Sequence, residues 1–399
     1  MEEPPHQHAK PTEETGPEEG EADHISKLPD DVLVGILSLC RYEDAVRTAL
    51  VSKRWERLVA QLPDLTLCLS VFGYRTSIGR PSEQRVQSLA RTLRRRCAAV
   101  RTLDLVYRRD VPMECRHADD FIALADAAKL VLRAQCDPAG RRSLEEIEDA
   151  GDWSLELPPA TTELEVQPFW YAVRPPRIHG CSVNTLRSLA LVGPTVLRQD
   201  FLLTGLPALE ELRIGECTLP AGIDITSGAM PRLKHLEITD VGVMTSETKA
   251  AINVLADELR TLRVSGRWCS STEPPSEHEM FLLNSAFQAS FTTYSSFRLR
   301  APRLRVFEWR CCYADEVRVD SVGRLSGVAV EIAAGRMPRA FGEDRRFVTT
   351  EQRDKLMADI LGELMPGLQP RSWEDVKRKC MQRERDDRWL CFEISACEE

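Results

Sequence analysis

The chain has 399 residues, of which 43% are hydrophobic and 29% are charged, and its formal net charge is −9. This length allows two or three domains, and the composition is ordinary for a soluble globular protein. The acidic balance argues against a nucleic-acid-binding protein, which needs a clustered basic face. One basic run, RTLRRRCAAVR at 91–101, is interpreted as a solvated helix face.

Residues 1–23 are acidic and rich in proline, and they carry no large apolar residue beyond Met1. They cannot bury enough surface to offset chain entropy, so we predict a disordered acidic tail rather than a leader peptide. The longest apolar run, VLVGILSLC, is well short of the ~20 residues of a membrane helix. We therefore expect a cytoplasmic or nuclear protein with no membrane contact.

Residues 24–64 form a compact apolar unit that predicts three short helices. Pro29 suits the first turn of a helix, and Asp30 and Asp31 lie near its positive end. A second helix is predicted over YEDAVRTAL, and Ser52 is a candidate N-cap for a third, KRWERLVAQL. Helices this short are not stable alone, so they need one another and a partner.

An internal repeat of the form L-x-x-L-x-L follows. Clear copies begin at Leu186, Leu209, Leu233, Leu259 and Leu304. The first four are spaced by 23, 24 and 26 residues, within the ~20–29-residue period of leucine-rich repeats, and a longer gap of 45 residues precedes the last. Weaker copies lie at Val100, around Leu164 and at Leu325. We predict a curved right-handed solenoid over residues 65–348, with parallel strands on its inner face.

Residues that alternate with the repeat leucines are predicted to point out along the concave face. They are Ser188, Ala190, Glu211, Arg213, His235, Glu237, Thr261, Arg263, Val306, Glu308 and Arg310. Any one of them is interpretable as a solvated strand position, whereas a row of them forms the natural binding surface of a solenoid. The candidate substrate-binding residues are Arg213, His235, Glu237, Arg263, Glu308 and Arg310.

Residues 349–399 are predicted to form an α/β end cap. TTEQRDKLMADILGELM is an amphipathic helix with Leu356, Ile360, Leu361 and Leu364 on one face, and PGLQP ends it. SWED from Ser372 has capping-box spacing for a second helix, which leads to an apolar strand, WLCFEI. A solenoid needs such an end to cover its last core layer.

Motifs of catalysis and metal binding are not found. The sequence has no G-x-S-x-G, H-E-x-x-H or phosphate-binding glycine loop. Its thirteen cysteines include no C-x-x-C, and no histidine lies at zinc spacing from a cysteine pair. We therefore expect no cofactor, no metal, reduced thiols and no catalytic activity.

The segment ISKLPDDVLVGILSLCRYEDAVRTALVSKRWERL closely resembles the F-box of plant F-box/leucine-rich-repeat proteins. The matching stretches are Leu28 to Leu33, Ile36 to Ser38, Asp44 to Thr48 and Val51 to Trp55. Cys40-Arg41 departs from the family, which usually has Leu-Pro there for contact with the adaptor. The resemblance implies an α/β protein with a three-helix F-box at 24–64, a leucine-rich-repeat solenoid and the C-terminal cap.

By this resemblance, the F-box binds a Skp-type adaptor that bridges to a cullin-RING ubiquitin ligase, and the repeats recruit a substrate protein. The expected adaptor-binding residues are Leu28, Pro29, Leu33, Ile36, Leu37, Val46, Val51 and Trp55. The chain is then a non-catalytic substrate receptor. An F-box scaffold that does not drive ubiquitylation is the main alternative. A small-molecule co-receptor, which needs a longer solenoid, and an enzyme of another class are weaker ones.

Overall fold

The computed structural model describes residues 25, 27–69, 83–96, 98–109, 111–135, 153–168, 175–196, 205–219, 222–243, 250–266, 293–333, 335–336, 347–365 and 389–395. The predicted tail at 1–23, the PGLQP stop and the predicted helix that begins near Ser372 lie outside these residues.

Three short helices begin the described chain, as the sequence predicts. They are α1 (Asp30–Ser38), α2 (Tyr42–Thr48) and α3 (Lys53–Val59). Pro29 is the residue before α1 rather than a member of its first turn. The Ser52 hydroxyl oxygen accepts a hydrogen bond from the Trp55 N–H (3.4 Å), which confirms Ser52 as the N-cap of α3.

A long twelve-stranded sheet dominates the described residues. In spatial order its strands are β1 (Asp64–Cys68), β2 (Thr102–Arg108), β3 (Lys129–Gln135), β5 (Glu163–Val166), β7 (Ser188–Val196), β8 (Glu211–Leu219), β10 (His235–Thr239), β13 (Thr261–Ser265), β15 (Val306–Arg310), β17 (Gly327–Ala333) and β20 (Trp389–Ser395). The short strand β11 (Gly242–Val243) pairs with β8. Every neighbouring pair is parallel except β17 with β20.

The predicted repeats coincide with this sheet. The copies at Leu186, Leu209, Leu233 and Leu259 lead into the adjacent parallel strands β7, β8, β10 and β13. Their second leucines pair in register from strand to strand and are buried: Leu189, Leu212, Leu236 and Leu262. The prediction of parallel strands is confirmed. The strands β1 and β3 belong to the same sheet but were not among the predicted copies.

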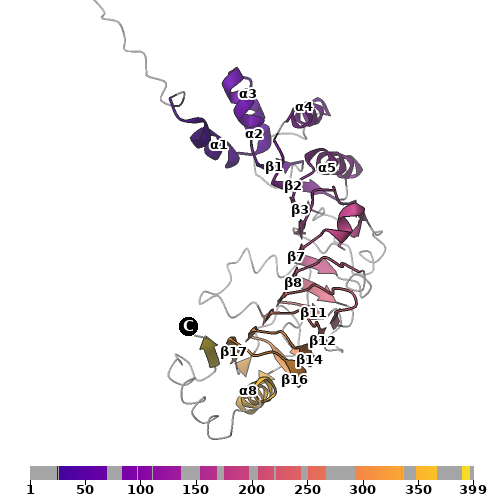
Figure 1. The fold of residues 1–399 in the computed structure, drawn as a ribbon, viewed down its shortest axis with the longest axis vertical. Coiled ribbons are helices and arrows are strands. Elements are labelled where there is room, and N and C mark those ends of the chain that lie inside the picture. The colour runs from indigo at the N-terminus through magenta and orange to yellow at the C-terminus, as the bar shows by residue number, and fades with distance from the viewer. Residues whose placement is uncertain are drawn as a thin grey trace, which may run out of the picture.

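The outer side of the sheet is covered by different elements along the chain. Toward the N-terminus these are α4 (Glu83–Arg94), α5 (Pro112–Ala125), a small sheet of β4 (Ser154–Glu156) with β6 (Arg177–His179), and the 3₁₀ helix η1 (Cys181–Asn184). Farther along, a four-stranded parallel sheet is ordered β16 (Tyr313–Val322), β14 (Thr293–Ala301), β12 (Ala250–Leu255) and β9 (Gly222–Thr226). Figure 1 shows the whole as an arc with the long sheet along its inner side.

A residue with a positive φ angle recurs along the inner strands, within β7 and β8 and directly after β10 and β15. Glu216, Asp240 and Cys311 have φ angles of 55°, 54° and 53°, each two residues after the second buried residue of its strand. The equivalent residue of β7 is Gly193, with a φ angle of 120°. A Cβ at Gly193 would lie 2.8 Å from the Pro168 carbonyl oxygen, so only glycine fits there.

Aromatic side chains join the two sheets in the C-terminal half. The Trp309 ring of β15 lies 4.8 Å from the Phe297 ring of β14 and 6.2 Å, edge to face, from the Tyr294 ring, measured between centroids. The Trp309 indole N–H donates to the Cys312 carbonyl (2.9 Å), and the Tyr294 hydroxyl donates to the Val241 carbonyl (3.2 Å). The polar ends of these buried rings are therefore satisfied.

The C-terminal segment closes the sheet. Helix α8 (Thr350–Leu364) packs against β16 and β17, and its predicted apolar face is buried, as expected: Leu356, Ile360, Leu361 and Leu364. The strand β20, predicted from WLCFEI, pairs antiparallel along the last parallel strand, β17. It covers an edge that would otherwise expose backbone donors and acceptors. A two-stranded ribbon, β18 (Gly335–Arg336) with β19 (Phe347–Val348), precedes α8.

The cysteines only partly match the expectation of reduced thiols. Six of the described ones are free: Cys40, Cys68, Cys115, Cys217, Cys312 and Cys391. Cys311, in contrast, is disulfide-bonded, which corrects the expectation at that position.

Candidate functional site: the helical surface and the inner sheet face

The three N-terminal helices divide their apolar residues between a core and an open surface. Leu33 and Leu37 of α1, Ala45 of α2 and Leu58 of α3 are buried. Val32, Ile36 and Leu39 lie on another side of α1 and are exposed, Leu39 to 89%. Spacings of four and three residues place these three side chains on one helical face. The unit therefore has more apolar surface than its own core uses.

The turn from α2 to α3 adds to this surface. Leu50 and Val51 are exposed to 87% and 75%. We define the apolar helix surface by its exposed residues, which are Ile25, Val32, Ile36, Leu39, Leu50 and Val51. Covering such exposed apolar side chains with a partner is favourable in free energy, because it removes apolar surface from water.

The eight predicted adaptor-binding residues fall into three groups. Pro29, Ile36 and Val51 are exposed, and Leu28, Val46 and Trp55 are half-buried. Leu33 and Leu37 are buried in the helical core, at 1% and 3% exposure, so they support this surface from beneath. Four exposed residues of this surface were not in the predicted set: Ile25, Val32, Leu39 and Leu50. Val32 and Leu39 share a helical face with Ile36, and Leu50 lies in the turn beside Val51, so these positions carried a readable signal, whereas Ile25 before α1 carried none.

Ion pairing holds the start of α1 against α3. The Arg54 guanidinium donates to the Asp30 carboxylate (2.6 and 2.8 Å) and to the Leu28 carbonyl (2.5 Å). The Leu28-Pro29 segment is therefore positioned by α3. Between α1 and α2, Cys40 is exposed and Arg41 is the N-cap residue of α2. The two helices are therefore still joined by a turn, although Cys40-Arg41 replaces the usual Leu-Pro.

A buried polar junction connects the helices to the first strand. The Glu43 carboxylate of α2 accepts a hydrogen bond from the Cys68 N–H at the end of β1 (3.0 Å). The Arg96 guanidinium donates to the Val59 carbonyl (3.1 Å) and to the Leu62 carbonyl just beyond α3. Burial raises the pKa of the Tyr42 hydroxyl, and the nearby Arg96 charge opposes that rise. The helical surface is thus held in a defined position relative to the sheet.

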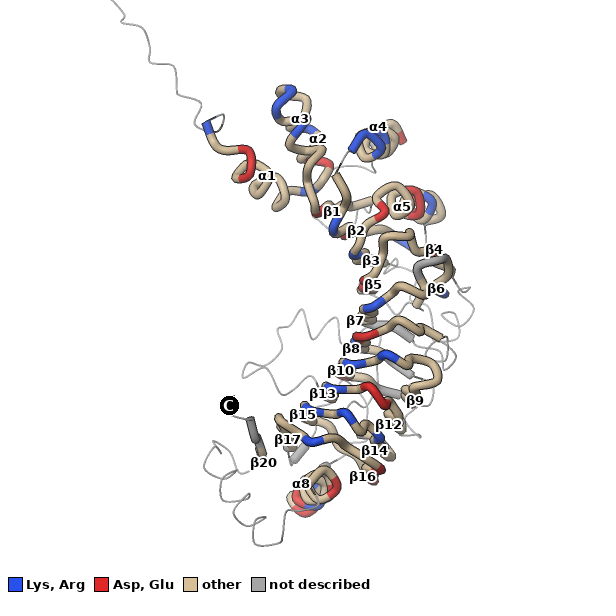
Figure 2. The backbone as a smooth tube through the Cα atoms, in the orientation of Figure 1, with Lys and Arg blue, Asp and Glu red and all other residues tan. Residues whose placement is uncertain are grey.

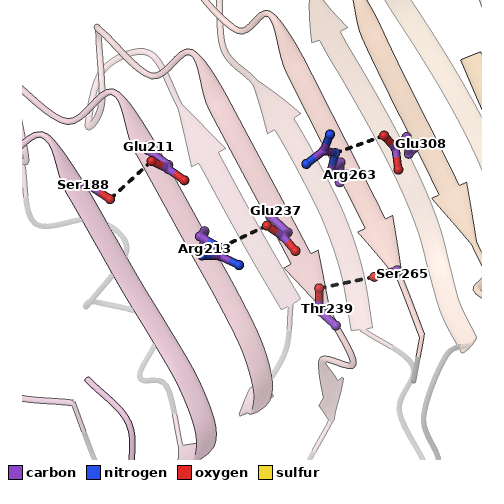
Figure 3. Close-up of polar contacts among 8 residues, drawn as sticks. All are labelled: Ser188, Glu211, Arg213, Glu237, Thr239, Arg263, Ser265 and Glu308. Carbon is purple, nitrogen blue, oxygen red and sulfur yellow. Dashed lines mark hydrogen bonds and ion pairs between the residues drawn. The ribbon is translucent and has the colours of Figure 1, made fainter. Parts of the chain in front are cut away.

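The inner face of the long sheet carries polar side chains that pair with one another (Figure 3). Arg213 donates to Glu237 (3.0 Å), and Arg263 donates to Glu308 (3.0 Å). Each pair spans neighbouring parallel strands at the same register position. Ser188 lies against Glu211 (3.4 Å), and Thr239 lies against Ser265 (3.2 Å).

Five of the six predicted substrate-binding residues belong to such ion pairs. Beyond the pairs above, Arg310 contacts Glu308 and Glu331 at 3.6 and 3.5 Å. The sixth, His235, is exposed at the start of β10. The structure thus places all six on one sheet, and it satisfies most of their charges internally. Their role in substrate binding stays a prediction.

The described residues contain no cluster of histidine, cysteine and acidic side chains that could hold a metal ion. Within the same residues, no helix is long and apolar enough to span a membrane.

Comparison with known proteins identifies the helical unit. A family model described as the F-box domain matches residues 25–66. These residues include all three helices and the beginning of β1. Residues 25–66 are therefore an F-box domain.

Curated relatives from Arabidopsis thaliana match short stretches of this chain. The F-box protein At1g80960 is 52% identical over 56 residues, which are 14% of this chain and 10% of the relative. The F-box/FBD/LRR-repeat protein At5g44980 is 44% identical over 52 residues, 13% of this chain and 12% of the relative. The putative F-box/LRR-repeat protein At4g15060 is 41% identical over 66 residues, 16% and 14% of the two chains.

Through its F-box the chain is similar to plant F-box/LRR-repeat proteins. The matches span only about a tenth to a seventh of these relatives' own length. No solved structure matches the chain.

Proposed function

We propose that the long parallel sheet and the elements outside it form a leucine-rich-repeat solenoid over residues 65–348, capped by residues 349–399. Support comes from the register: first leucines such as Leu209 and Leu233 are fully buried, and the strands they begin are parallel neighbours. The F-box match ends within β1, which supports the proposed boundary between the two domains near this strand. The right-handed sense of the solenoid stays a prediction.

A second observation supports the repeat assignment. Leucine-rich repeats often carry asparagine or cysteine three residues after the last leucine of L-x-x-L-x-L. Cys217 and Cys312 occupy this position, and both are buried. The Cys217 thiol lies 3.1 Å from the Gly215 carbonyl oxygen and 3.5 Å from that of Leu191 on the preceding strand. The residue therefore occupies a polar turn inside the core, where a weak donor is useful.

We further propose that the protein is a non-catalytic substrate receptor of an SCF-type ubiquitin ligase. The F-box binds a Skp-type adaptor, and the repeat sheet binds the substrate protein. The observation that carries this proposal is the apolar helix surface, since exposed leucines on an F-box domain need a partner to cover them. We also propose that the protein is located in the cytoplasm or the nucleus.

The adaptor contact is tested with the double variant Leu50→Ala, Val51→Ala. Both side chains are open in the free chain, so their replacement removes interface area and leaves the helical core intact. We expect the free energy of adaptor binding to weaken by about 2–4 kcal/mol, because anchors of this kind dominate interface affinity. The measurement is calorimetric titration of the purified adaptor.

The matched control is Met113→Ala, which removes an exposed apolar side chain from α5, outside the F-box. Unchanged adaptor affinity is expected for it. Full adaptor affinity in the folded Leu50→Ala, Val51→Ala variant would refute the proposed contact. Co-purification of a cullin with the adaptor complex then separates a ligase receptor from the alternative, an F-box scaffold that sequesters the adaptor.

A further inference from the structure

One line of residues crosses the sheet at the amino ends of its strands. The N–H groups of Glu210, Lys234, Arg260 and Arg305 each donate to the carbonyl of the equivalent residue one strand earlier, beginning at Arg187, at 2.8 Å in every case. These five residues therefore lie side by side, one per strand from β7 to β15. Adjacent strands are ~4.8 Å apart, so the line is roughly 19 Å long.

This line is strongly basic. Four of its five residues are cations, and Arg232 lies in the turn that precedes β10. Lys234 pairs with Glu210 (2.7 Å). That hydrogen bond, with the nearby charges of Arg187 and Arg232, lowers the pKa of the Glu210 carboxyl. The one acid of the line is thus already held by cations. Figure 2 shows the blue segments along the inner side of the arc beside β7, β10, β13 and β15, with red at β8.

The arginines at these strand ends form no ion pair and no side-chain hydrogen bond with another described residue. They are Arg187, Arg232, Arg260 and Arg305, and all four are exposed. We call these four residues the basic edge. The neighbouring turns also hold Asp257 and Glu258, but these acids pair with Arg300 and Arg303. The central inner face differs, because Arg213 and Arg263 have carboxylate partners there.

We infer that the basic edge binds an extended acidic segment of the substrate protein. This inference rests on the proposed substrate-receptor function and assigns the chemistry of the substrate contact. A guanidinium group binds carboxylate or phosphate through paired N–H donors, and open arginines are ready to do so. An extended chain rises ~3.3 Å per residue, so about six residues span the line and bring acidic side chains to several arginines.

The surroundings favour a peptide over a nucleic acid. Nonspecific binding of single-stranded nucleic acid uses aromatic side chains as stacking platforms, and the large exposed apolar residues of the described chain include no aromatic.

The test uses the full chain in complex with its adaptor and two fluorescein-labelled probes. One is an oligoglutamate of about eight residues, and the other is a phosphoserine peptide of similar length, which separates carboxylate from phosphate as the source of the charge. Fluorescence anisotropy at low salt gives the affinities. The edge variant is Arg187→Glu, Arg260→Glu, Arg305→Glu. The matched control, Arg91→Glu, Arg94→Glu, Arg116→Glu, makes the same charge change on exposed arginines of α4 and α5.

We expect at least one probe to bind the wild-type chain, with an affinity that falls as salt is added. The edge variant should lose on the order of ten-fold or more, because three attractive contacts become repulsive, while the control loses little. The neutral variant Arg187→Gln, Arg260→Gln, Arg305→Gln should lie between the two. Thermal unfolding shows whether each variant remains folded.

Three outcomes overturn the inference: no binding of either peptide, an equal loss in the edge and control variants, or tighter edge-dependent binding of a single-stranded oligonucleotide. Adaptor affinity is measured on the same samples and is expected to be unchanged by the edge variant, since the edge begins well beyond the F-box. If peptide binding does not depend on the basic edge but the adaptor still binds, only this inference is refuted and the F-box proposal stands. If the wild-type chain does not bind the adaptor, the F-box proposal is refuted instead.

Discussion

Glu43 shows how much a single buried carboxylate contributes to this fold. It is 7% exposed, and its hydrogen bond to the Cys68 N–H joins α2 to β1. Truncation in Glu43→Ala leaves that backbone donor without its charged acceptor, so we expect the free energy of unfolding to fall by about 1.5–3 kcal/mol. Urea unfolding followed by circular dichroism measures the change.

Glu43→Gln retains an acceptor oxygen and should recover part of this stability. Glu56→Ala serves as the surface control, because Glu56 is an exposed residue of α3. A loss in Glu43→Ala no larger than in Glu56→Ala would show that the junction does not depend on the carboxylate.

At the scale of elements, α8 depends on its N-terminal capping box. The Thr349 hydroxyl oxygen accepts from the Gln352 N–H (3.1 Å), and the Gln352 side-chain oxygen accepts from the Thr349 N–H (3.0 Å). Two N–H groups at this helix end are thereby satisfied. We expect Thr349→Ala to destabilise the protein by about 1 kcal/mol. The measurement is a shift of the urea midpoint at constant slope.

The neighbouring substitution Thr350→Ala changes the same residue type one position inside the helix and removes no cap. It should leave the midpoint nearly unchanged. Equal effects of the two substitutions would contradict a capping role. The predicted capping box at Ser372 lies outside the described residues, so the structure offers no comparison for it.

At the scale of the whole molecule, cross-strand ion pairs make stability depend on pH. Hydrogen bonds from Arg101, Lys234 and Arg298 lower the pKa values of the Asp64, Glu210 and Asp320 carboxyls, respectively. Carboxyls with a lowered folded-state pKa stabilise the fold above their unfolded pKa, which is near 4, and this contribution is lost as pH falls below it. We therefore expect the Tm to drop between about pH 5 and pH 3.

The triple variant Asp64→Asn, Glu210→Gln, Asp320→Asn should have a lower Tm at neutral pH and a flatter dependence on pH. Differential scanning calorimetry across this range makes the comparison. Asp119 acts in the opposite direction, because burial raises its pKa, and it is left unchanged in the variant. An unaltered slope in the triple variant would show that these pairs do not cause the acid sensitivity.

The sequence by itself determined the periodic parts of the fold. Leucines at 189, 212, 236 and 262 repeat every 23 to 26 residues. Parallel stacking of the strands that carry them buries these leucines in register. The same holds for the helical face of α8 and for the N-cap Ser52, since both depend on residues within a few positions. The F-box motif is likewise local, and the matching family model covers the same residues.

Only the tertiary structure decided which side chains remain open to a partner. Leu33 and Ile36 are equally apolar and three residues apart, yet one is buried by its neighbouring helices and the other is exposed. Arg213 and Arg260 are both arginines on repeat segments, but only Arg213 has a glutamate at the same register on the next strand. Burial and pairing depend on contacts between residues far apart in the chain. A pattern of residue types can therefore predict which segments form the binding surface, but not which of their side chains remain exposed or unpaired.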